Sequence, residues 1–167
     1  MLPIQLPHET QRIGRLDILL SIKPKYSTLI LDGTKRVEYR KKPFDYLSVV
    51  KTIFFYESAP TKRIVGCADI DRIIFTTLSR LWQETSVTGG ISKEEFDLYF
   101  KGRMEGYGIV LKNVIKFEQD LDPRVINPDF TPPVSFIYLP PTTVNRNTQL
   151  WQFLVQQKSL YQNTTNV

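Results

Sequence analysis

The chain has 167 residues, 41% of them hydrophobic and 12% aromatic, which suits one folded domain with a sizeable core. Its 22 Lys and Arg exceed its 17 Asp and Glu, and the net charge of +5 favours polyanionic partners such as nucleic acid. A single cysteine and a single histidine exclude a disulfide framework, a multi-cysteine zinc site and a Ser-His-Asp triad. No apolar run approaches the roughly 20 residues of a membrane span, so we expect a cytoplasmic protein without membrane contact.

The first third of the chain predicts a buried strand followed by a short helix. Residues 1–15 show no clear periodicity and are expected to form a flexible lead-in. Leu16–Ile22 is a compact apolar run, as in a buried strand. The helix is expected to begin near Pro24, with Ser21 close to its N-cap, and to end at Gly33, which tolerates the left-handed conformation of a helix end.

Four further segments are rich in strand-forming residues. They are residues 34–40, 49–57, 63–76, with a bend expected at Gly66, and 106–117. Short loops join the earlier of these segments, which is typical of a meander in a small barrel.

A helical insert is predicted between the last two strands. Residues 77–84 form one expected helix, and a capping box that begins at Ser92 starts a second helix, which Gly102 ends. The spacer Thr88-Gly89-Gly90 is expected to be a loop between the two helices.

The remaining residues are turn-rich and then polar. Residues 121–136 carry several prolines, and residues 140–167 form a polar C-terminal extension rich in Asn, Gln and Thr. We expect one helix around 147–160, either docked or disordered, and a possible protein partner that contacts the extension near Trp151.

The octet at residues 33–40 carries the most functional information. In extended chain alternate side chains share a face, so Glu38 and Arg40 are expected on one side and Lys35 on the other. Lys35 could bind phosphate or act as a base or nucleophile, but it could equally be a solvated lysine on an edge strand. Glu38 could accept hydrogen bonds from a base edge, or it could pair with a neighbouring arginine.

Other candidates flank this octet in the expected fold. Lys23 stands at a helix start, where backbone N–H groups favour anions. Tyr56 could stack on a base or belong to the core, and Ser58 follows it at the same strand end. Arg40 could contact phosphate, and Ser135 could place a hydroxyl near the cleft or cap a turn.

Seven landmarks in a fixed order resemble the ASCH (activating-signal-cointegrator homology) domains of the PUA-like superfamily, in particular small prokaryotic PUA-like predicted regulators. The landmarks are Ser21-Ile-Lys23-Pro24-Lys-Tyr26, Gly33-x-Lys35-x-x-Glu38-x-Arg40, Phe55-Tyr56-Glu-Ser58-Ala-Pro60, Val65-Gly66, the segment 90–96, Gly106-Tyr107-Gly-Ile and Pro132-Pro133-x-Ser135-Phe136.

The resemblance covers roughly residues 16–139 and implies an α+β fold. That fold is a small, mainly antiparallel PUA-like β-barrel with helices packed at its ends, to which residues 140–167 add a C-terminal appendage. The resemblance also implies a ligand cleft near Gly33–Glu38 that holds RNA or a modified nucleotide.

Some ASCH proteins hydrolyse acylated cytidine with a lysine, a threonine and a distant glutamate. Lys35 matches the lysine, but Glu38 occupies the place of the threonine. Thr88-Gly89-Gly90 stands where the distant glutamate is expected. Two of the three residues are therefore missing, and this turns the expectation from that chemistry towards recognition.

Three functional hypotheses follow. In the first, the chain binds RNA or a nucleotide without a metal or cofactor: Lys35 and Arg40 meet phosphate or carbonyl oxygens, Glu38 reads a base edge and Tyr56 stacks on a base. In the second, the chain is a metal-independent hydrolase of modified nucleosides or RNA, with Lys35 and Glu38 in proton transfer. In the third, it is a protein-interaction or regulatory module.

Overall fold

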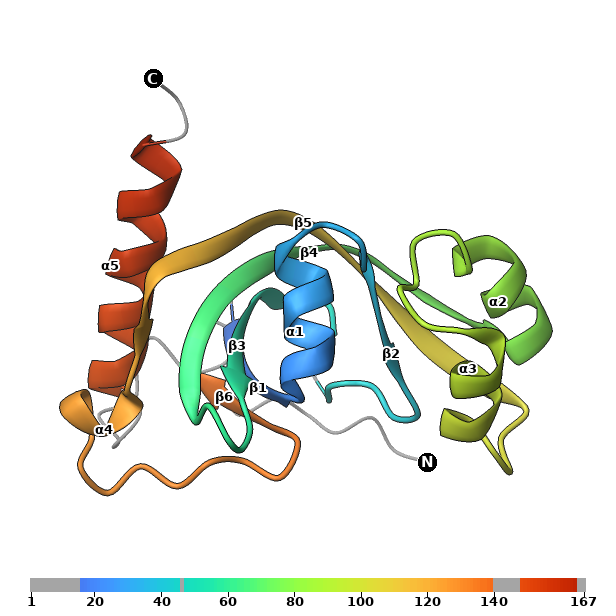
Figure 1. Cartoon of the computed structure of the whole chain (residues 1–167), viewed down its shortest axis with the longest axis horizontal. Helices are drawn as coiled ribbons and strands as arrows, with labels where there is room; N and C mark the ends of the chain where they lie inside the picture. Colours follow the sequence, from blue (N-terminus) through green and yellow to red (C-terminus); the bar gives the residue numbers. More distant parts are fainter. Residues whose placement is uncertain (1–15, 46, 140–147, 165–167) are drawn as a thin grey trace.

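A computed structural model describes residues 16–45, 47–139 and 148–164 (Figure 1). Residues 1–15 and 140–147, expected to hold the lead-in and the start of the C-terminal extension, lie outside the described residues. The elements in chain order are β1 (Leu16–Ile22), α1 (Pro24–Leu31), β2 (Val37–Arg40), β3 (Val50–Glu57), β4 (Arg63–Thr77), α2 (Leu78–Thr85), α3 (Lys93–Tyr99), β5 (Glu105–Leu121), α4 (Pro123–Ile126), β6 (Phe136–Leu139) and α5 (Thr148–Thr164).

The six strands form one sheet in the order β2-β5-β4-β3-β1-β6. All neighbouring strands are antiparallel except β1 and β3, which are parallel. Figure 1 shows β4 and β5 arching over α1, which lies on the concave side of the sheet. The predicted α+β, mainly antiparallel fold is confirmed. The expected barrel is not closed, because β2 and β6 stand at opposite edges of the curved sheet.

The predicted meander is confirmed for β3, β4 and β5, which are antiparallel neighbours in sequence order, but it is wrong for β2. β1 pairs with β3 in parallel, and β2 pairs with β5 instead of with its neighbours in sequence. β2 also begins later than expected, at Val37. The preceding residues belong to a loop because the Lys35 and Arg36 amides donate to the carbonyls of Leu29 and Thr88.

Two short elements lie within or directly after the segment 121–136, which was predicted to be turn-rich. Asp122 caps α4 by accepting a hydrogen bond from the Arg124 amide, and Pro123 occupies the first helical position. β6 completes the sheet by pairing with β1. Ser21 does not cap α1, because its hydroxyl donates to the Pro133 carbonyl at 2.6 Å; the α1 N-cap is Lys23.

The part of the chain that the structure describes forms three apolar clusters. Successive side chains of β1 point to opposite faces of the sheet, so Ile18 and Leu20 pack under α1 while Leu19 packs on the other face. This two-sided burial explains why β1 is a continuous apolar run. The third cluster joins α2 and α3 to β2 and contains Val37, Tyr39, Leu81, Phe96 and Phe100.

Helix α5 packs against the outer face of the sheet. Leu150 and Leu154 are buried in the second cluster, and the Trp151 indole donates to Asp17 at 3.0 Å. The Lys158 ammonium is buried and donates to Asp69 and Thr52. Of the helices that the structure describes, none is both long and apolar enough to cross a membrane.

Asp69 is the centre of the polar contact between α5 and the sheet. Partial burial tends to raise the pKa of its carboxyl, but hydrogen bonds from Lys158, Asn113 and Thr52 outweigh that effect, and the pKa lies below its ordinary value. The ionised carboxylate therefore stabilises the docked helix.

We expect Lys158→Ala to lower the free energy of unfolding by about 3 kcal/mol, because removal of one partner leaves the other charge of a buried pair uncompensated. Urea unfolding followed by tryptophan fluorescence measures the loss. Gln156→Ala, an exposed position on the same helix, serves as the control. Equal stability of the two variants would contradict this account of how α5 is held.

Candidate functional site

The Lys35 side chain is almost completely buried, with 3% of it exposed. Its ammonium donates to the Val37 carbonyl at 2.6 Å and to the Gly89 carbonyl at 2.9 Å, and it lies 3.7 Å from a Glu38 carboxylate oxygen. An ammonium has three hydrogens, so two are taken by carbonyls and the third side faces Glu38. Lys35 is therefore a structural cation within the protein.

The expectation that Lys35 and Glu38 face opposite sides is wrong. The alternation rule applies only within a strand, and Lys35 precedes β2 by two residues. Gly33, with φ +85°, ends α1 and lets the chain turn so that the Lys35 side chain reaches back to Glu38. The two residues with the clearest functional signal thus meet as an ion pair.

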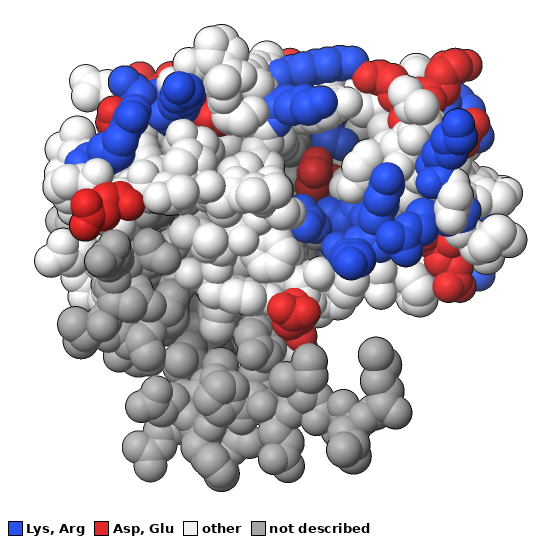
Figure 2. Space-filling model, turned by 90° about the horizontal axis from the view of Figure 1, so that it is seen from below, with Lys and Arg blue, Asp and Glu red and all other residues white. Residues whose placement is uncertain are grey.

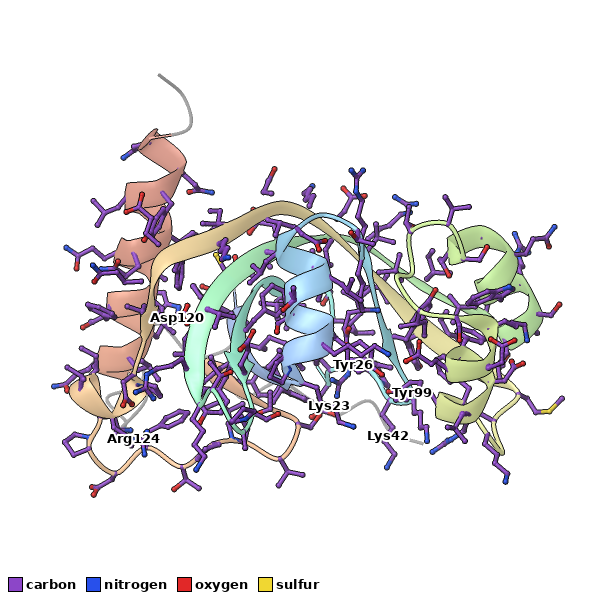
Figure 3. The ribbon with its side chains drawn as sticks, in the orientation of Figure 1. Lys23, Tyr26, Lys42, Tyr99, Asp120 and Arg124 are labelled. Atoms are coloured by element: carbon purple, nitrogen blue, oxygen red, sulfur yellow. The ribbon has the colours of Figure 1, made fainter. Side chains whose placement is uncertain are left out.

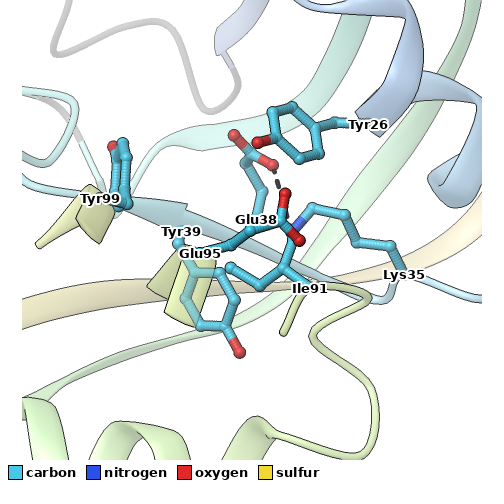
Figure 4. Close-up of a pocket in the computed structure, with 7 residues that line it drawn as sticks. All are labelled: Tyr26, Lys35, Glu38, Tyr39, Ile91, Glu95 and Tyr99. Carbon is cyan, nitrogen blue, oxygen red and sulfur yellow. Dashed lines mark ion pairs between the residues drawn. The ribbon is translucent and has the colours of Figure 1, made fainter. Parts of the chain in front are cut away.

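Glu38 opens into a small pocket of about 70 Å³ (Figure 4). Its side chain is 16% exposed, so the carboxylate is accessible from the pocket although it is paired with Lys35. Tyrosines from three elements line the pocket: Tyr26 from α1, Tyr39 from β2 and Tyr99 from α3. Aromatic walls around the accessible Glu38 carboxylate, with the Glu95 carboxylate also in the lining, suit a planar ligand that carries N–H donors.

Both members of the pair have shifted pKa values. Burial raises the pKa of the Glu38 carboxyl, and the nearby charges of Lys35 and Arg40 offset this only in part. Burial likewise lowers the pKa of Lys35, against the opposing effect of Glu38. A pair that is costly to ionise inside a pocket is typical of a functional site.

The Thr88-Gly89-Gly90 loop packs directly against this pair. A Cβ atom on Gly89 would lie 2.1 Å from the Tyr39 hydroxyl oxygen, and one on Gly90 would lie 2.6 Å from the Lys35 Cβ. Gly90 also has φ +66°. Both positions therefore require glycine, and the segment that the sequence presented as a spacer closes one side of the site.

Tyr39 joins the loop side of the site to α2. Its ring centroid lies 4.7 Å from the Lys35 ammonium, which is within the range of a cation–π contact. Its hydroxyl is hydrogen bonded to Thr85 at 2.8 Å, and Thr85 donates in turn to the Leu81 carbonyl. These contacts fix the ring beside the ammonium.

Arg40 and Ser135, both sequence candidates, are brought together at the open side of the sheet. The Arg40 guanidinium donates to the Ser135 hydroxyl at 2.8 Å and lies over the rings of Phe44 and Phe136 at 5.0 and 5.2 Å. Arg40 thereby links the end of β2 to the residues just before β6.

Lys23 lies exposed at the start of α1. Figure 3 shows Lys23, Tyr26, Tyr99 and Lys42 on one side of the molecule, between α1 and α3. Lys23 thus lies on the same side of the molecule as Tyr26 and Tyr99, two tyrosines that line the pocket.

Tyr56 and Ser58 lie elsewhere. Tyr56 is 3% exposed and packs against Phe130, with ring centroids 5.4 Å apart. Ser58 and Tyr56 line a separate cavity of about 330 Å³ that also includes Arg124. The structure does not bring these two residues to the Lys35–Glu38 pair.

Five pocket residues were missed as site candidates by the sequence reasoning: Tyr26, Tyr39, Ile91, Glu95 and Tyr99. The pattern placed Tyr99 with Phe96 and Phe100 as packing, yet Tyr99 is 40% exposed while the two phenylalanines are buried. The helical spacing could have separated Tyr99 from the buried residues. Phe96 and Phe100 are four residues apart and share a helix face, and Tyr99 lies only at the edge of that face. Glu95 forms an ion pair with Lys25 at the rim.

The mouth of the pocket carries an excess of positive charge. Figure 2 shows an acidic side chain recessed in a hollow, with Lys and Arg side chains gathered beside it. Lys25 pairs with Glu95 of the pocket lining, and the Lys41 ammonium lies over the Tyr99 ring. Figure 3 places Lys23 and Lys42 near Tyr26 and Tyr99. Within the described ranges, no three His, Cys, Asp or Glu side chains are grouped so as to hold a metal ion.

Comparisons with known proteins identify the matching family. The ASCH domain family matches residues 20–119. An ASCH domain-containing ribonuclease of Zymomonas mobilis is 26% identical over 132 residues, which cover 75% of this chain and 85% of that protein. The large ribosomal subunit protein uL22 of Ureaplasma parvum is 27% identical over 107 residues, or 63% of this chain, and the chain spans 33% of its length.

Solved structures show the same fold. A single-substitution variant of ASCH from Zymomonas mobilis superimposes with a TM-score of 0.71 at 24% identity, covering 84% of this chain and 99% of that chain. The unsubstituted protein gives a TM-score of 0.69 at 23% identity, with 81% and 94% covered.

We expect Gly90→Ala to destabilise the protein more than Gly102→Ala, by about 1 kcal/mol or more, because its methyl group would displace Lys35. Gly102 has φ +80° with no atom within 4 Å of an added Cβ. The Gly102→Ala variant therefore measures the cost of backbone strain without steric overlap. Urea unfolding of both variants measures the difference. Equal losses would show that the loop does not press on Lys35.

Proposed function

This chain belongs to the ASCH domain family, and we propose that it binds single-stranded RNA through the pocket around Glu38. The observation that carries the proposal is the Glu38 carboxylate, held by a buried lysine and open to a small tyrosine-lined pocket. Unpaired RNA bases are recognised by stacking on aromatic rings and by hydrogen bonds to their edges, which this pocket can supply.

In the proposed complex Glu38 accepts hydrogen bonds from N–H groups on the edge of one base. Lys35 acts as a positioning residue, since the Val37 and Gly89 carbonyls take up two of its hydrogens and its third side faces Glu38 as an ion pair. This role replaces the direct phosphate contact that the sequence suggested for Lys35. Tyr26 and Tyr99 supply the aromatic surfaces at the mouth.

The phosphate groups would meet the cations at the mouth of the pocket. Lys23, Lys41 and Lys42 are exposed, and the Lys41 ammonium lies 5.1 Å from the centroid of the Tyr99 ring. Sequence-independent affinity for nucleic acid comes mainly from such contacts. The names of two relatives, a ribonuclease and a ribosomal protein, support RNA as the partner.

We expect Glu38→Gln to weaken binding of a fluorescein-labelled single-stranded RNA about tenfold, since it removes the charge-assisted contacts to the base. Lys42→Ala should weaken binding of all RNA sequences alike and reduce the salt slope by about one. Fluorescence anisotropy over a salt series measures both effects. Glu84→Gln, an exposed carboxylate on α2, is the matched control. Binding that Glu38→Gln leaves intact would refute the proposed site.

The same site predicts a pH dependence of binding. Because the pKa of Glu38 is raised in the folded protein, the carboxylate gains a proton at a higher pH than an ordinary glutamate does. Affinity should therefore fall on acidification at a pH above the usual glutamate range, and Glu38→Gln should lack this fall. Anisotropy titrations from neutral to mildly acidic pH provide the measurement.

RNA cleavage is a second candidate function, favoured by the raised pKa of Glu38 and by the ribonuclease among the relatives. A carboxylate with a raised pKa is a stronger base. Glu38 would take the proton of a ribose 2′-hydroxyl, whose oxygen attacks the adjacent phosphorus. The 5′ oxygen leaves and takes a proton from water, which yields a 2′,3′-cyclic phosphate and a 5′-hydroxyl.

We expect any such activity to disappear in Glu38→Gln while Glu84→Gln retains it. Mass spectrometry of the RNA products identifies 2′,3′-cyclic phosphate ends. If Glu38→Gln cleaves as fast as the unmodified protein, or if no cyclic phosphate forms, the cleavage mechanism is wrong and only the binding role stands.

A further inference from the structure

An aromatic pair with one exposed ring lies on the sheet beside the candidate site. Phe75 from β4 and Tyr107 from β5 are stacked, with ring centroids 4.4 Å apart and planes 23° from parallel. Phe75 is 54% exposed, so the stack leaves much of its ring open to solvent. Neither residue contributes to the Glu38 pocket.

Strand register places this pair on the same face of the sheet as Glu38. Arg40 pairs with Tyr107, and Tyr107 pairs with Phe75, so the three form one row across β2, β5 and β4. Directly opposed residues share a face, and Glu38 shares that face with Arg40 because it lies two residues away on β2.

The row is also close to the pocket. Strand spacing and the rise along a strand put the Cα atoms of Glu38 and Tyr107 about 8 Å apart. Arg40 stands between them in the register, and Lys41 and Lys42 follow it in the chain as exposed cations. The open aromatic surface is thus continuous with the positively charged mouth.

We propose that the Phe75–Tyr107 stack is a second base-binding site, so that the protein holds at least two neighbouring nucleotides of one RNA strand. This inference rests on the proposed function and extends it. Aromatic side chains on an open sheet face stack on unpaired bases of any sequence. The base in the Glu38 pocket is read by its edge, and the base on Phe75 is held by its flat face.

The experiment must distinguish base binding by the Phe75–Tyr107 pair from a purely structural role of the same pair. Cross-strand aromatic contacts stabilise a sheet even without a ligand. A purely structural pair would affect thermal stability but not the binding of RNA, and a self-association surface would affect the oligomeric state.

The test compares the Glu38 pocket alone with both sites together. Nucleoside monophosphates probe the pocket, and a single-stranded RNA hexamer that contains 2-aminopurine probes both sites, since its fluorescence is quenched when the base stacks. We expect Phe75→Ala to weaken hexamer binding about tenfold and to reduce the quenching, while monophosphate binding is unchanged. Phe75→Trp should restore both signals, and Val125→Ala, a 79% exposed residue on α4, should behave like the unmodified protein.

The possible outcomes separate this inference from the proposed function. Hexamer binding that depends on Glu38 but not on Phe75 would overturn the second site alone. A hexamer affinity unchanged in Phe75→Ala together with a loss of dimers in sedimentation would identify the stack as a contact between copies of the chain. The absence of any RNA binding by the unmodified protein would overturn both.

Discussion

The candidate site depends on one buried ammonium group. Lys35 donates to carbonyls on either side of it, Val37 at the start of β2 and Gly89 in the loop after α2, and it lies beside the Glu38 carboxylate. A buried cation must have its hydrogens satisfied, so these three groups are held around it at once. The Lys35 contacts thereby fix the position of the loop and the direction of Glu38, and with them the shape of the pocket.

Among the described residues, two ion pairs with a buried lysine have opposite energetic character. At Lys35–Glu38 burial has the larger effect, because it raises the pKa of Glu38 and lowers the pKa of Lys35. Both shifts favour the neutral forms, so ionisation of this pair costs stability. At Lys158–Asp69 hydrogen bonds outweigh burial, and the pKa of Asp69 falls. The second pair anchors α5 and strengthens the scaffold, whereas the first keeps an accessible carboxylate in an apolar pocket. Such a division is common where a site is tuned for recognition or proton transfer.

One face of the curved sheet unites the features that bear on function. Glu38, Arg40, Tyr107 and Phe75 are related by strand pairing across β2, β5 and β4. Because β2 lies at the sheet edge, its side chains reach both the tyrosine-lined pocket and the open side, where Arg40 contacts Ser135. A strand at the edge of an open sheet can thus present an accessible carboxylate and cations side by side.

The sequence by itself determined the local features: the bounds of β1, the glycine end of α1, the capping box at Ser92, and Lys35 and Glu38 as the residues to examine. These follow from interactions among residues a few positions apart, which periodicity and capping rules describe. Only the tertiary structure decided that β2 pairs with β5, that Gly89 and Gly90 enclose Lys35, and that α5 docks on the sheet. Each of these depends on contacts between residues more than 50 positions apart, where many pairings satisfy the same local pattern and the packing of the whole core selects one.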